Sequence, residues 1–301
     1  MRGPDPRIGA VLGLSTLAFA CAGEGAGDAA RELHVMSFNV LCVFCGGDEF
    51  DPWEQRVTYF RDLFKRHTPD LIGLQELTFA ADVEEVLGRR SEYTALYFTD
   101  GADSYADATI FYRSDRFAVL DSGFYWLSPT PDAKYSKGYA DGQVVPRLVA
   151  WGRFSDLNAG GRQIELVTTH FDNNAPAQDR SAPLVLERTA LAAQRGAVIV
   201  TGDFNSQTYD PAYRLLTTGT ATVAGGFRLT NASDLAAELR LDTDEAPPPE
   251  YPLPERIDHI FLAGAGTRWR VPSWTVDLRK YGDRQRYPSD HRAITAVVDF
   301  D

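Results

Sequence analysis

Side chains capable of chemistry follow four apolar runs in this sequence, each at the point where the run ends. They are Asn39, Glu76, His170 and the pair Asp203 and Asn205. Ligand sites of α/β proteins commonly lie at the carboxyl ends of strands, so we expect these side chains to share one site. Asp258 lies inside another apolar run, and Asp290 and His291 precede the last one. Carboxylates bind hard divalent cations, and carboxylates with imidazoles transfer protons.

Each of these residues has a plainer interpretation when it is taken alone. An isolated Asn or Asp after a strand usually forms a turn or caps a loop. A buried His usually serves as a hydrogen-bonding group of the core. The number and order of the polar residues are therefore what favours one site over a set of unrelated turns.

Short runs rich in Val, Ile, Phe, Tyr and Thr predict strands at 34–40, 70–74, 93–98, 109–112, 164–169, 197–201, 256–262 and 293–300. A helix is predicted after Asp51, which is read as an N-cap followed by Pro52 and a capping-box Glu54. Further helices are expected at 182–194 and from Asp210 through Leu216. This pattern predicts an α/β (α+β) fold, a four-layer sandwich of two packed mixed β-sheets flanked by helices.

The first twenty residues have the pattern of a signal peptide. Arg2 and Arg7 precede an apolar run, 8–20, that ends Ala-Phe-Ala before Cys21. Residues 21–31 are rich in Gly and Ala, which is typical of a flexible segment. The junction suits ordinary cleavage, and it also loosely suits lipid attachment to Cys21. We therefore expect export, to the periplasm or medium or with a lipid anchor at the cell envelope.

The acidic balance of the chain disfavours long polyanions as partners. The formal net charge is −12, and removal of 1–20, which hold two Arg and one Asp, makes it −13. Nucleic-acid binders usually neutralise phosphates with clusters of Lys and Arg, and no such cluster stands out in the sequence. A bound metal would still supply local positive charge.

The polar residues resemble, in their order, the signature motifs of the endonuclease/exonuclease/phosphatase superfamily, which includes pancreatic-type deoxyribonucleases, abasic-site endonucleases, bacterial sphingomyelinases and deadenylases. The matching motifs are Met36-Ser-Phe-Asn39-Val, Asp70-Leu-Ile-Gly-Leu-Gln-Glu76, Thr169-His170, Thr201-Gly-Asp203-Phe-Asn205, Arg256-Ile-Asp258 and Ser289-Asp290-His291. The resemblance predicts one domain of that superfamily at 32–301. The hallmarks of the phosphoinositide phosphatases are absent from the sequence.

The resemblance also implies a metal site. Glu76 and Asp290, with Asn39 beside them, would supply hard oxygen ligands for Mg²⁺ or Mn²⁺. The metal would bind a non-bridging phosphate oxygen and offset the charge that develops on the leaving oxygen.

The remaining matched residues receive catalytic roles from the same resemblance. His291 would act as general base or as a neutral donor to the phosphoryl group, with Asp258 fixing its tautomer. Asp203 would orient or deprotonate the attacking water, and Asn205 would hold a phosphoryl oxygen. His170 would stabilise the phosphate or protonate the leaving group.

Three further positions are expected to contact the substrate. Arg147 lies in a segment that often carries Arg in relatives, although it could also pair with an acidic neighbour. Asp172 and Asn174 follow the predicted catalytic His170, and a loop-capping role is the alternative for both.

Cys42 and Cys45 are spaced C-x-x-C, which in an exported protein predicts a short disulfide loop. Zinc binding would need a second pair of ligands that the sequence does not show nearby. Two free buried thiols are the other alternative.

The predicted function is hydrolysis of a small or lipid-linked phosphoester by a monomer. Contact with a membrane is expected only in the alternative in which Cys21 carries a lipid. A nuclease that acts on DNA or RNA is the alternative. A catalytically inactive surface binding protein is disfavoured, because no metal ligand or catalytic His is lost. A glycosidase with paired carboxylates would leave the two His and the two Asn without a role.

Overall fold

The computed structural model describes residues 31–89, 91–100, 103–219 and 226–301. The predicted signal peptide, 1–20, and Cys21 lie outside these residues. None of the helices in the described parts is both long and apolar enough to cross a membrane.

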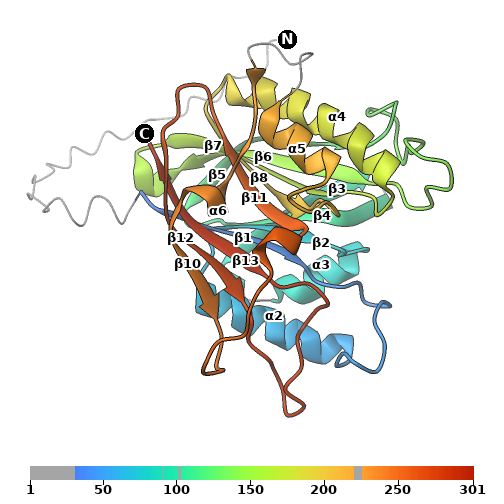
Figure 1. Ribbon diagram of the computed structural model, residues 1–301, viewed down its shortest axis with the longest axis vertical. Coiled ribbons are helices and arrows are strands. Elements are labelled where there is room, and N and C mark those ends of the chain that lie inside the picture. The colour runs from blue at the N-terminus through green and yellow to red at the C-terminus, as the bar shows by residue number, and fades with distance from the viewer. Residues whose placement is uncertain (1–30, 90, 101–102, 220–225) are drawn as a thin grey trace, which may run out of the picture.

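Two packed β-sheets form the centre of the molecule (Figure 1). The first sheet has the strand order β10 (Ala236–Asp242), β12 (Trp269–Asp277), β13 (Ile294–Phe300), β1 (Leu33–Asn39), β2 (Leu71–Gln75), β4 (Asp103–Arg113) and β3 (Tyr93–Asp100). The second has the order β5 (Phe117–Trp126), β6 (Leu148–Asp156), β7 (Arg162–His170), β8 (Ala197–Asp203), β11 (Asp258–Ala263) and β9 (Thr230–Asn231). Both sheets are mixed, because β1–β2 and β7–β8 are parallel pairs among antiparallel ones.

Helices cover the outer faces of both sheets. On the first sheet, α2 (Trp53–His67) and α3 (Ala80–Leu87) enclose an apolar cluster that includes Phe38 and Phe60. On the second, α4 (Ala175–Ala193) and α5 (Pro211–Thr218) enclose a cluster around Phe171 and Phe204. A third cluster, which includes Leu71 and Leu166, fills the space between the sheets. The predicted four-layer α/β sandwich is therefore confirmed.

Two predicted helix starts are wrong. Pro52, not Asp51, is the residue before the first helical position, and no side chain caps α2. The Asp51 carboxylate instead accepts a hydrogen bond from Tyr59 Oη at 3.0 Å. Helix α4 begins at Ala175 rather than at 182 and continues through Pro183. Buried residues in its first turns, among them Ala177 and Gln178, pack the early part against the sheet.

The sequence patterns also missed whole elements. Strands β5 and β10 are interrupted by exposed polar residues, and β12 by Arg270, Pro272 and other non-apolar residues, so apolar residues do not extend along these three strands. The short helix α3 follows β2 without a side-chain cap from a Ser, Thr, Asp or Asn. The short segments α6 (Ala232–Leu235) and the 3₁₀ turns at Leu157–Ala159 and Leu253–Glu255 complete the described structure.

Candidate active site

The ends of five strands bring the predicted polar residues together at the edge where the two sheets meet. In the first sheet β1 and β2 are parallel neighbours, so Asn39 at the end of one lies beside Glu76 just after the other. In the second sheet His170 is the register partner of Asp203, because β7 and β8 are parallel. Asp258 lies opposite Asp203 from the other side, on the antiparallel β11.

The Asn39 side chain connects the two sheets. Its Nδ2 donates to Glu76 Oε1 at 2.9 Å and to Asp203 Oδ2 at 3.0 Å, and its Oδ1 accepts from the backbone N of Leu41 at 3.0 Å. The amide oxygen that the resemblance assigned to a metal accepts this one hydrogen bond from its own loop and keeps a second lone pair. In this arrangement Asn39 orients two carboxylates.

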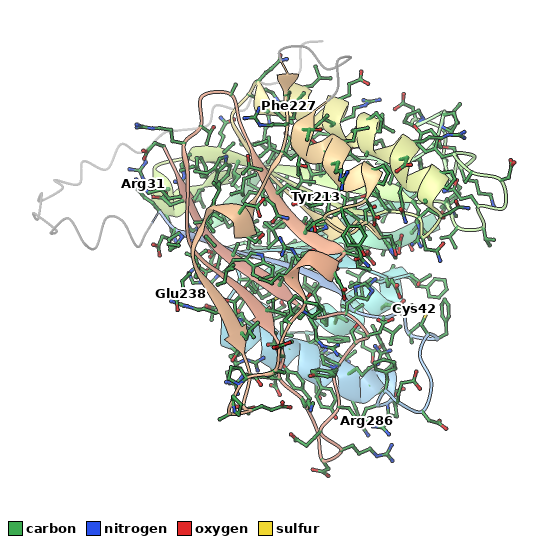
Figure 2. The ribbon with its side chains drawn as sticks, in the orientation of Figure 1. Arg31, Cys42, Tyr213, Phe227, Glu238 and Arg286 are labelled. Carbon is green, nitrogen blue, oxygen red and sulfur yellow. A yellow bond between two sulfur atoms is a disulfide. The ribbon has the colours of Figure 1, made fainter. Side chains whose placement is uncertain are left out.

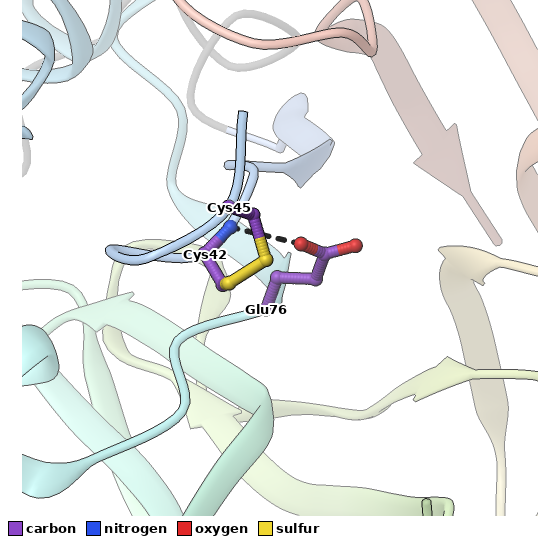
Figure 3. A group of neighbouring side chains, drawn as sticks. All are labelled: Cys42, Cys45 and Glu76. Carbon is purple, nitrogen blue, oxygen red and sulfur yellow. Dashed lines mark hydrogen bonds between the residues drawn. A yellow bond between two sulfur atoms is a disulfide. The ribbon is translucent and has the colours of Figure 1, made fainter. Parts of the chain in front are cut away.

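Glu76 is held by backbone groups of the neighbouring loop. Cys42 and Cys45 are joined by a disulfide, and the backbone N of Cys42 donates to Glu76 Oε2 at 2.8 Å (Figure 3). Figure 2 labels Cys42 on the loop after β1. Glu76 itself has a φ of 69°, and Asn205 has a φ of 47°, both in the left-handed region that side chains other than Gly rarely adopt.

Arg56 of α2 fixes the loop that follows β1. Its guanidinium is buried and donates to the backbone oxygens of Val40, Leu41 and Cys42 at 2.7, 2.9 and 3.1 Å. Burial lowers the pKa of Arg56, and the Asp290 and Glu76 carboxylates counteract this in part. Arg56 is thus a buried cation close to both carboxylates, a residue whose role the sequence did not indicate.

The segment before β13 reaches the same place through Ser289. Ser289 Oγ donates to the backbone O of Asn39 at 2.7 Å and accepts from the backbone N of His291 at 3.1 Å. It also lies 3.2 Å from Asp290 Oδ1. Asp290 is exposed to solvent, so its carboxylate is accessible to a ligand.

His291 is held between two carboxylates. Its Nδ1 donates to Asp258 Oδ2 at 2.8 Å, and its Nε2 lies 3.6 Å from Asp203 Oδ2. Burial lowers the pKa of His291, but Asp258 and Asp203 outweigh this and raise the pKa to about 10. Burial raises the pKa of Asp258, which the charge of His291 offsets only in part. The two groups compete for one proton, and we place it on His291 because Nδ1 has a close acceptor.

Asp203 carries negative charge at the centre of the site. Burial raises the pKa of its carboxyl, but His170, His291, the backbone N of Asn205 and the Asn39 amide together bring the pKa below its ordinary value. The hydrogen bond from Asn205 N to Asp203 Oδ1 measures 2.9 Å. A buried carboxylate with this many donors stays ionised at neutral pH.

His170 faces the same carboxylate from the other side. Its Nε2 lies 3.5 Å from Asp203 Oδ2, and its Nδ1 lies 3.0 Å from Asp107 Oδ1. Asp107 also contacts Arg147 at 3.1 Å. Burial raises the pKa of Asp107, but His170 and Arg147 lower it by more, so the pKa is about 2. Asp107 was not predicted from the sequence. A lone Asp between two Ala in an apolar strand was the available signal.

Arg147 is engaged by the protein rather than open to a ligand. Its NH1 lies 3.1 Å from Asp107 and 2.8 Å from His170 Nδ1, and its side chain is 12% exposed. Nδ1 cannot donate to Asp107 and accept from Arg147 at the same time. We assign a proton to Nδ1 because the Asp107 carboxylate only accepts. This geometry matches the alternative in which Arg147 pairs with an acidic neighbour.

Asn205, Asp172 and Asn174 lie together at the entrance to α4. Asn205 Nδ2 donates to the backbone O of Phe171 at 3.0 Å. Asp172 is buried and accepts from the backbone N of Asn174 at 3.0 Å, so it closes the turn before the helix. Asn174 is half-buried and precedes the first helical residue.

A cavity of about 400 Å³ adjoins the His291 side of the site. Asp258, Asp290 and His291 form part of its lining, and Tyr251, Tyr287 and Arg292 form part of the rest. Arg292 lies over the Tyr287 ring at 3.4 Å from the centroid. The site is therefore open on one side to a small molecule.

The donor chemistry of the site fits a hard divalent cation. Glu76 and Asp290 present carboxylate oxygens, each of which has lone pairs beyond its hydrogen bonds. The Oδ1 atom of buried Asp258 has no hydrogen-bond partner among the described residues. The Cys42 and Cys45 sulfurs near Glu76 are bonded to each other, so soft ligation is excluded.

Comparison with known proteins agrees with this geometry. The model of the Endonuclease/Exonuclease/phosphatase family matches residues 36–291, more than half of the chain. The chain belongs to this family. Members of the family are hydrolases of phosphoesters and depend on divalent metals.

Solved structures of family members have the same fold. An endonuclease/exonuclease/phosphatase from Bacteroides vulgatus is 26% identical with a TM-score of 0.71, covering 90% of this chain and 99% of its own. A mannosyl-6-phosphatase from Bacteroides thetaiotaomicron is 28% identical with a TM-score of 0.70, covering 89% and 99%. D. rerio TDP2, complexed with single strand DNA product, is 21% identical with a TM-score of 0.64, covering 89% and 99%. No curated protein matches this chain.

Proposed function

We propose that this protein hydrolyses a small or lipid-linked phosphoester with Mg²⁺ or Mn²⁺, by in-line attack of a water that Asp203 activates. One observation carries the proposal. An unbroken series of contacts runs from Glu76 through Asn39 and Asp203 to His291 and Asp258, across both sheets. The series joins a cation-binding carboxylate to two proton-transfer groups.

The charge states favour separate roles for the two central groups. Asp203 stays ionised and is therefore able to orient a water and accept its proton. His291 carries its proton at neutral pH, since its pKa is raised to about 10, and so it suits donation to a phosphoryl oxygen. Of the two bases that the resemblance left open, this geometry favours Asp203.

His170 and Asn205 complete the phosphate-binding groups. Asp107 accepts from His170 Nδ1, which leaves Nε2 facing Asp203 and the space beside it. As an imidazolium, with Nδ1–H held by Asp107, His170 would present Nε2–H to stabilise the phosphoryl group or to protonate the leaving oxygen. Arg147 positions this pair, while Asp172 and Asn174 border the site as the turn before α4.

Glu76 and Asp290 are the residues that would hold the metal, and Asn39 would orient Glu76. When bound, the metal supplies Lewis-acid stabilisation of phosphate charge. The buried Arg56 guanidinium supplies a positive charge near these carboxylates and donates to the backbone of the loop after β1.

The substrate preference rests on charge. The described Arg147 is already engaged, and the whole chain has a net charge of −12, so a long polynucleotide would gain little from counterion release. A compact phosphoester needs only the metal and the local donors. The disulfide beside Glu76 supports the proposed export, because such bonds persist in oxidising compartments.

The test is turnover on a panel of duplex DNA, single-stranded RNA, nucleotides, phospholipids and sugar phosphates, with Mg²⁺ or Mn²⁺ and then with chelator. We expect loss of activity with chelator, and faster turnover of a small or lipid phosphoester than of nucleic acid. Glu76→Gln should raise the metal concentration needed for half-maximal rate, whereas Glu84→Gln, an exposed acid on α3, should not. Duplex DNA cleaved faster than every small substrate would make the protein a nuclease.

A further inference from the structure

A cavity on the outer face of the second sheet is not part of the proposed active site. It has a volume of about 420 Å³ and lies between β5, β6 and β7 on one side and the C-terminal half of α4 on the other. Val167 lines it, whereas Leu166 packs into the core between the sheets. Because side chains alternate along a strand, His170 lies on the face of Leu166 and the cavity lies on the opposite face.

The cavity is also distant along α4. Arg188 on its wall follows Asn174, at the start of the helix beside the active site, by about four turns, or roughly 21 Å. The cavity is therefore a separate feature of the fold.

Trp151 forms an aromatic wall of this cavity. Its register partner on the edge strand β5 is Gly123. A Cβ at residue 123 would lie 2.7 Å from Trp151 Cζ2 and 2.9 Å from Nε1, closer than real side chains approach. Glycine thus lets the half-buried indole lie back against β5, where its ring borders the cavity.

Two hydroxyl groups beside the cavity have no hydrogen-bond partner among the described residues. They are Tyr125 Oη and Thr189 Oγ1, and both are buried. An unsatisfied buried hydroxyl typically costs about 1–3 kcal/mol, so two of them in one place indicate groups that a ligand satisfies. Arg188 lies over the Tyr125 ring at 5.5 Å from its centroid, and its exposed side chain is the part that a ligand would displace.

The charges around the cavity are balanced in pairs. Arg195 contacts Glu165 at 2.9 Å, Arg188 contacts Asp132 at 3.7 Å, and Arg153 lies 3.9 Å from Asp121. Three guanidinium groups therefore face three carboxylates. Such a rim offers donors and acceptors side by side without a net charge that would select an anion or a cation.

We propose that this cavity binds a ring of a neutral saccharide. The C–H face of a pyranose packs against an indole, while its hydroxyls both donate and accept, as the orphan hydroxyls of Tyr125 and Thr189 require. An apolar ligand would leave those hydroxyls unpaired, and a charged ligand would have to break the rim pairs. The volume lies within the usual range for small-molecule sites. This inference does not depend on the proposed hydrolysis.

The experiment is saturation-transfer NMR on the intact protein with maltose, cellobiose and lactose as probes, and with sulfate and free arginine as charged competitors. We expect saturable transfer from at least one disaccharide, unaffected by Mg²⁺ with inorganic phosphate or by Asp203→Asn in the active site. Trp151→Ala should weaken that binding at least about tenfold. Trp269→Ala, a half-buried Trp on β12, is the matched control and should leave it unchanged.

Tyr125→Phe and Thr189→Val separate binding from folding. Each removes an orphan hydroxyl, so thermal stability should stay the same or rise while saccharide binding falls severalfold. No transfer from any disaccharide to the wild-type protein, displacement by sulfate or arginine, or full binding by Trp151→Ala or by both hydroxyl variants would overturn the proposal.

Discussion

Asp203 contacts side chains that come from both sheets. It receives the Asn39 amide from the first sheet, and it faces His170 at the end of β7 and His291 in the segment before β13. Because its carboxylate is buried among these donors, it is held in one orientation without solvent competition. The paired groups behind it, Asp107 and Asp258, set the proton positions on the two imidazoles.

The first prediction concerns Asp258→Asn. Burial lowers the pKa of His291, but Asp258 and Asp203 together raise it to about 10, so the imidazolium is present below that pH and is lost as pH rises through it. Replacing the carboxylate with an amide should move this titration to lower pH and reduce kcat by roughly 10²-fold or more. An NMR titration of the His291 ring in metal-free protein measures the shift directly. Asp115→Asn, an exposed acid in the β4–β5 turn, should leave His291 unchanged.

A second prediction tests Asp107 as a positioning residue. Asp107→Asn keeps the size of the side chain but removes the charge that holds His170 Nδ1–H and Arg147. We expect kcat to fall roughly tenfold to a hundredfold with little change in KM, because substrate contacts stay in place. A rise in KM at constant kcat would instead assign Asp107 to substrate binding.

The sequence indicated the functional residues that lie next to apolar runs. It could not indicate the residues that position them. Asn39 and His291 were visible because a polar side chain ends or precedes a run. Asp107 and Arg56 were not, because their partners, His170 and the Val40 backbone oxygen, come from other elements. Only the packed fold brings such pairs together.

The loop between β1 and α2 is the element that sets Glu76. The disulfide closes it at Cys42 and Cys45, and Arg56 binds three of its backbone oxygens. The disulfide and Arg56 therefore both constrain the Cys42 N–H that donates to Glu76.

The third prediction is that reduction of this disulfide weakens metal binding. In the double variant Cys42→Ser/Cys45→Ser the loop is less constrained, so Cys42 N–H holds Glu76 less firmly. We expect Mn²⁺ affinity, measured by calorimetry, to fall severalfold while the overall fold is kept. Equal affinities in the oxidised protein and the double variant would show that Arg56 alone holds the loop.

Element boundaries were predictable only where apolar periodicity and burial coincide. Strands β1, β2 and β8 are buried at nearly every position, and their apolar runs located them to within two residues. Half of the positions of the edge strand β5 are exposed, and its pairing with β6 comes from tertiary context. The start of α4 was missed because Pro183 resembles a helix boundary, although the helix passes through it.

For the whole molecule, the two-sheet arrangement followed from the alternation of strands and helices together with the ordered motifs. The cavity beyond β6 did not, since it depends on Gly123 and Trp151 meeting across two strands. Such pairings have no signature in a single sequence.

The fourth prediction links global stability to His259, whose ring is fully buried. Its Nε2 donates to the backbone O of Ser206 at 2.9 Å, and its Nδ1 lies 3.2 Å from the Asn231 amide, which donates to it. Burial lowers the pKa of His259 to about 3. The unfolded chain then binds a proton that the folded chain does not, so this stabilisation is complete above about pH 6.5 and is lost as pH falls toward 3.

Denaturant unfolding at a series of pH values measures this effect. From this group we expect the free energy of unfolding to fall by up to about 1.4 kcal/mol per pH unit below pH 6.5. His259→Gln should be less stable at neutral pH and should show a smaller pH slope than the wild type. Parallel pH curves for the two proteins would contradict the assignment.

The left-handed backbone at Glu76 and Asn205 has a consequence for the evolution of this protein. Non-glycine residues in that region cost of order 1 kcal/mol or more, so glycine at residue 205 should make the chain more stable and less active. Glycine at residue 76 would instead leave Asn39 Nδ2 and the Cys42 N–H without this acceptor, which offsets the relief of strain. Asn205 holds a phosphoryl oxygen in the proposed mechanism, so a laboratory screen that scores only thermal survival should recover chains that are stable but less active.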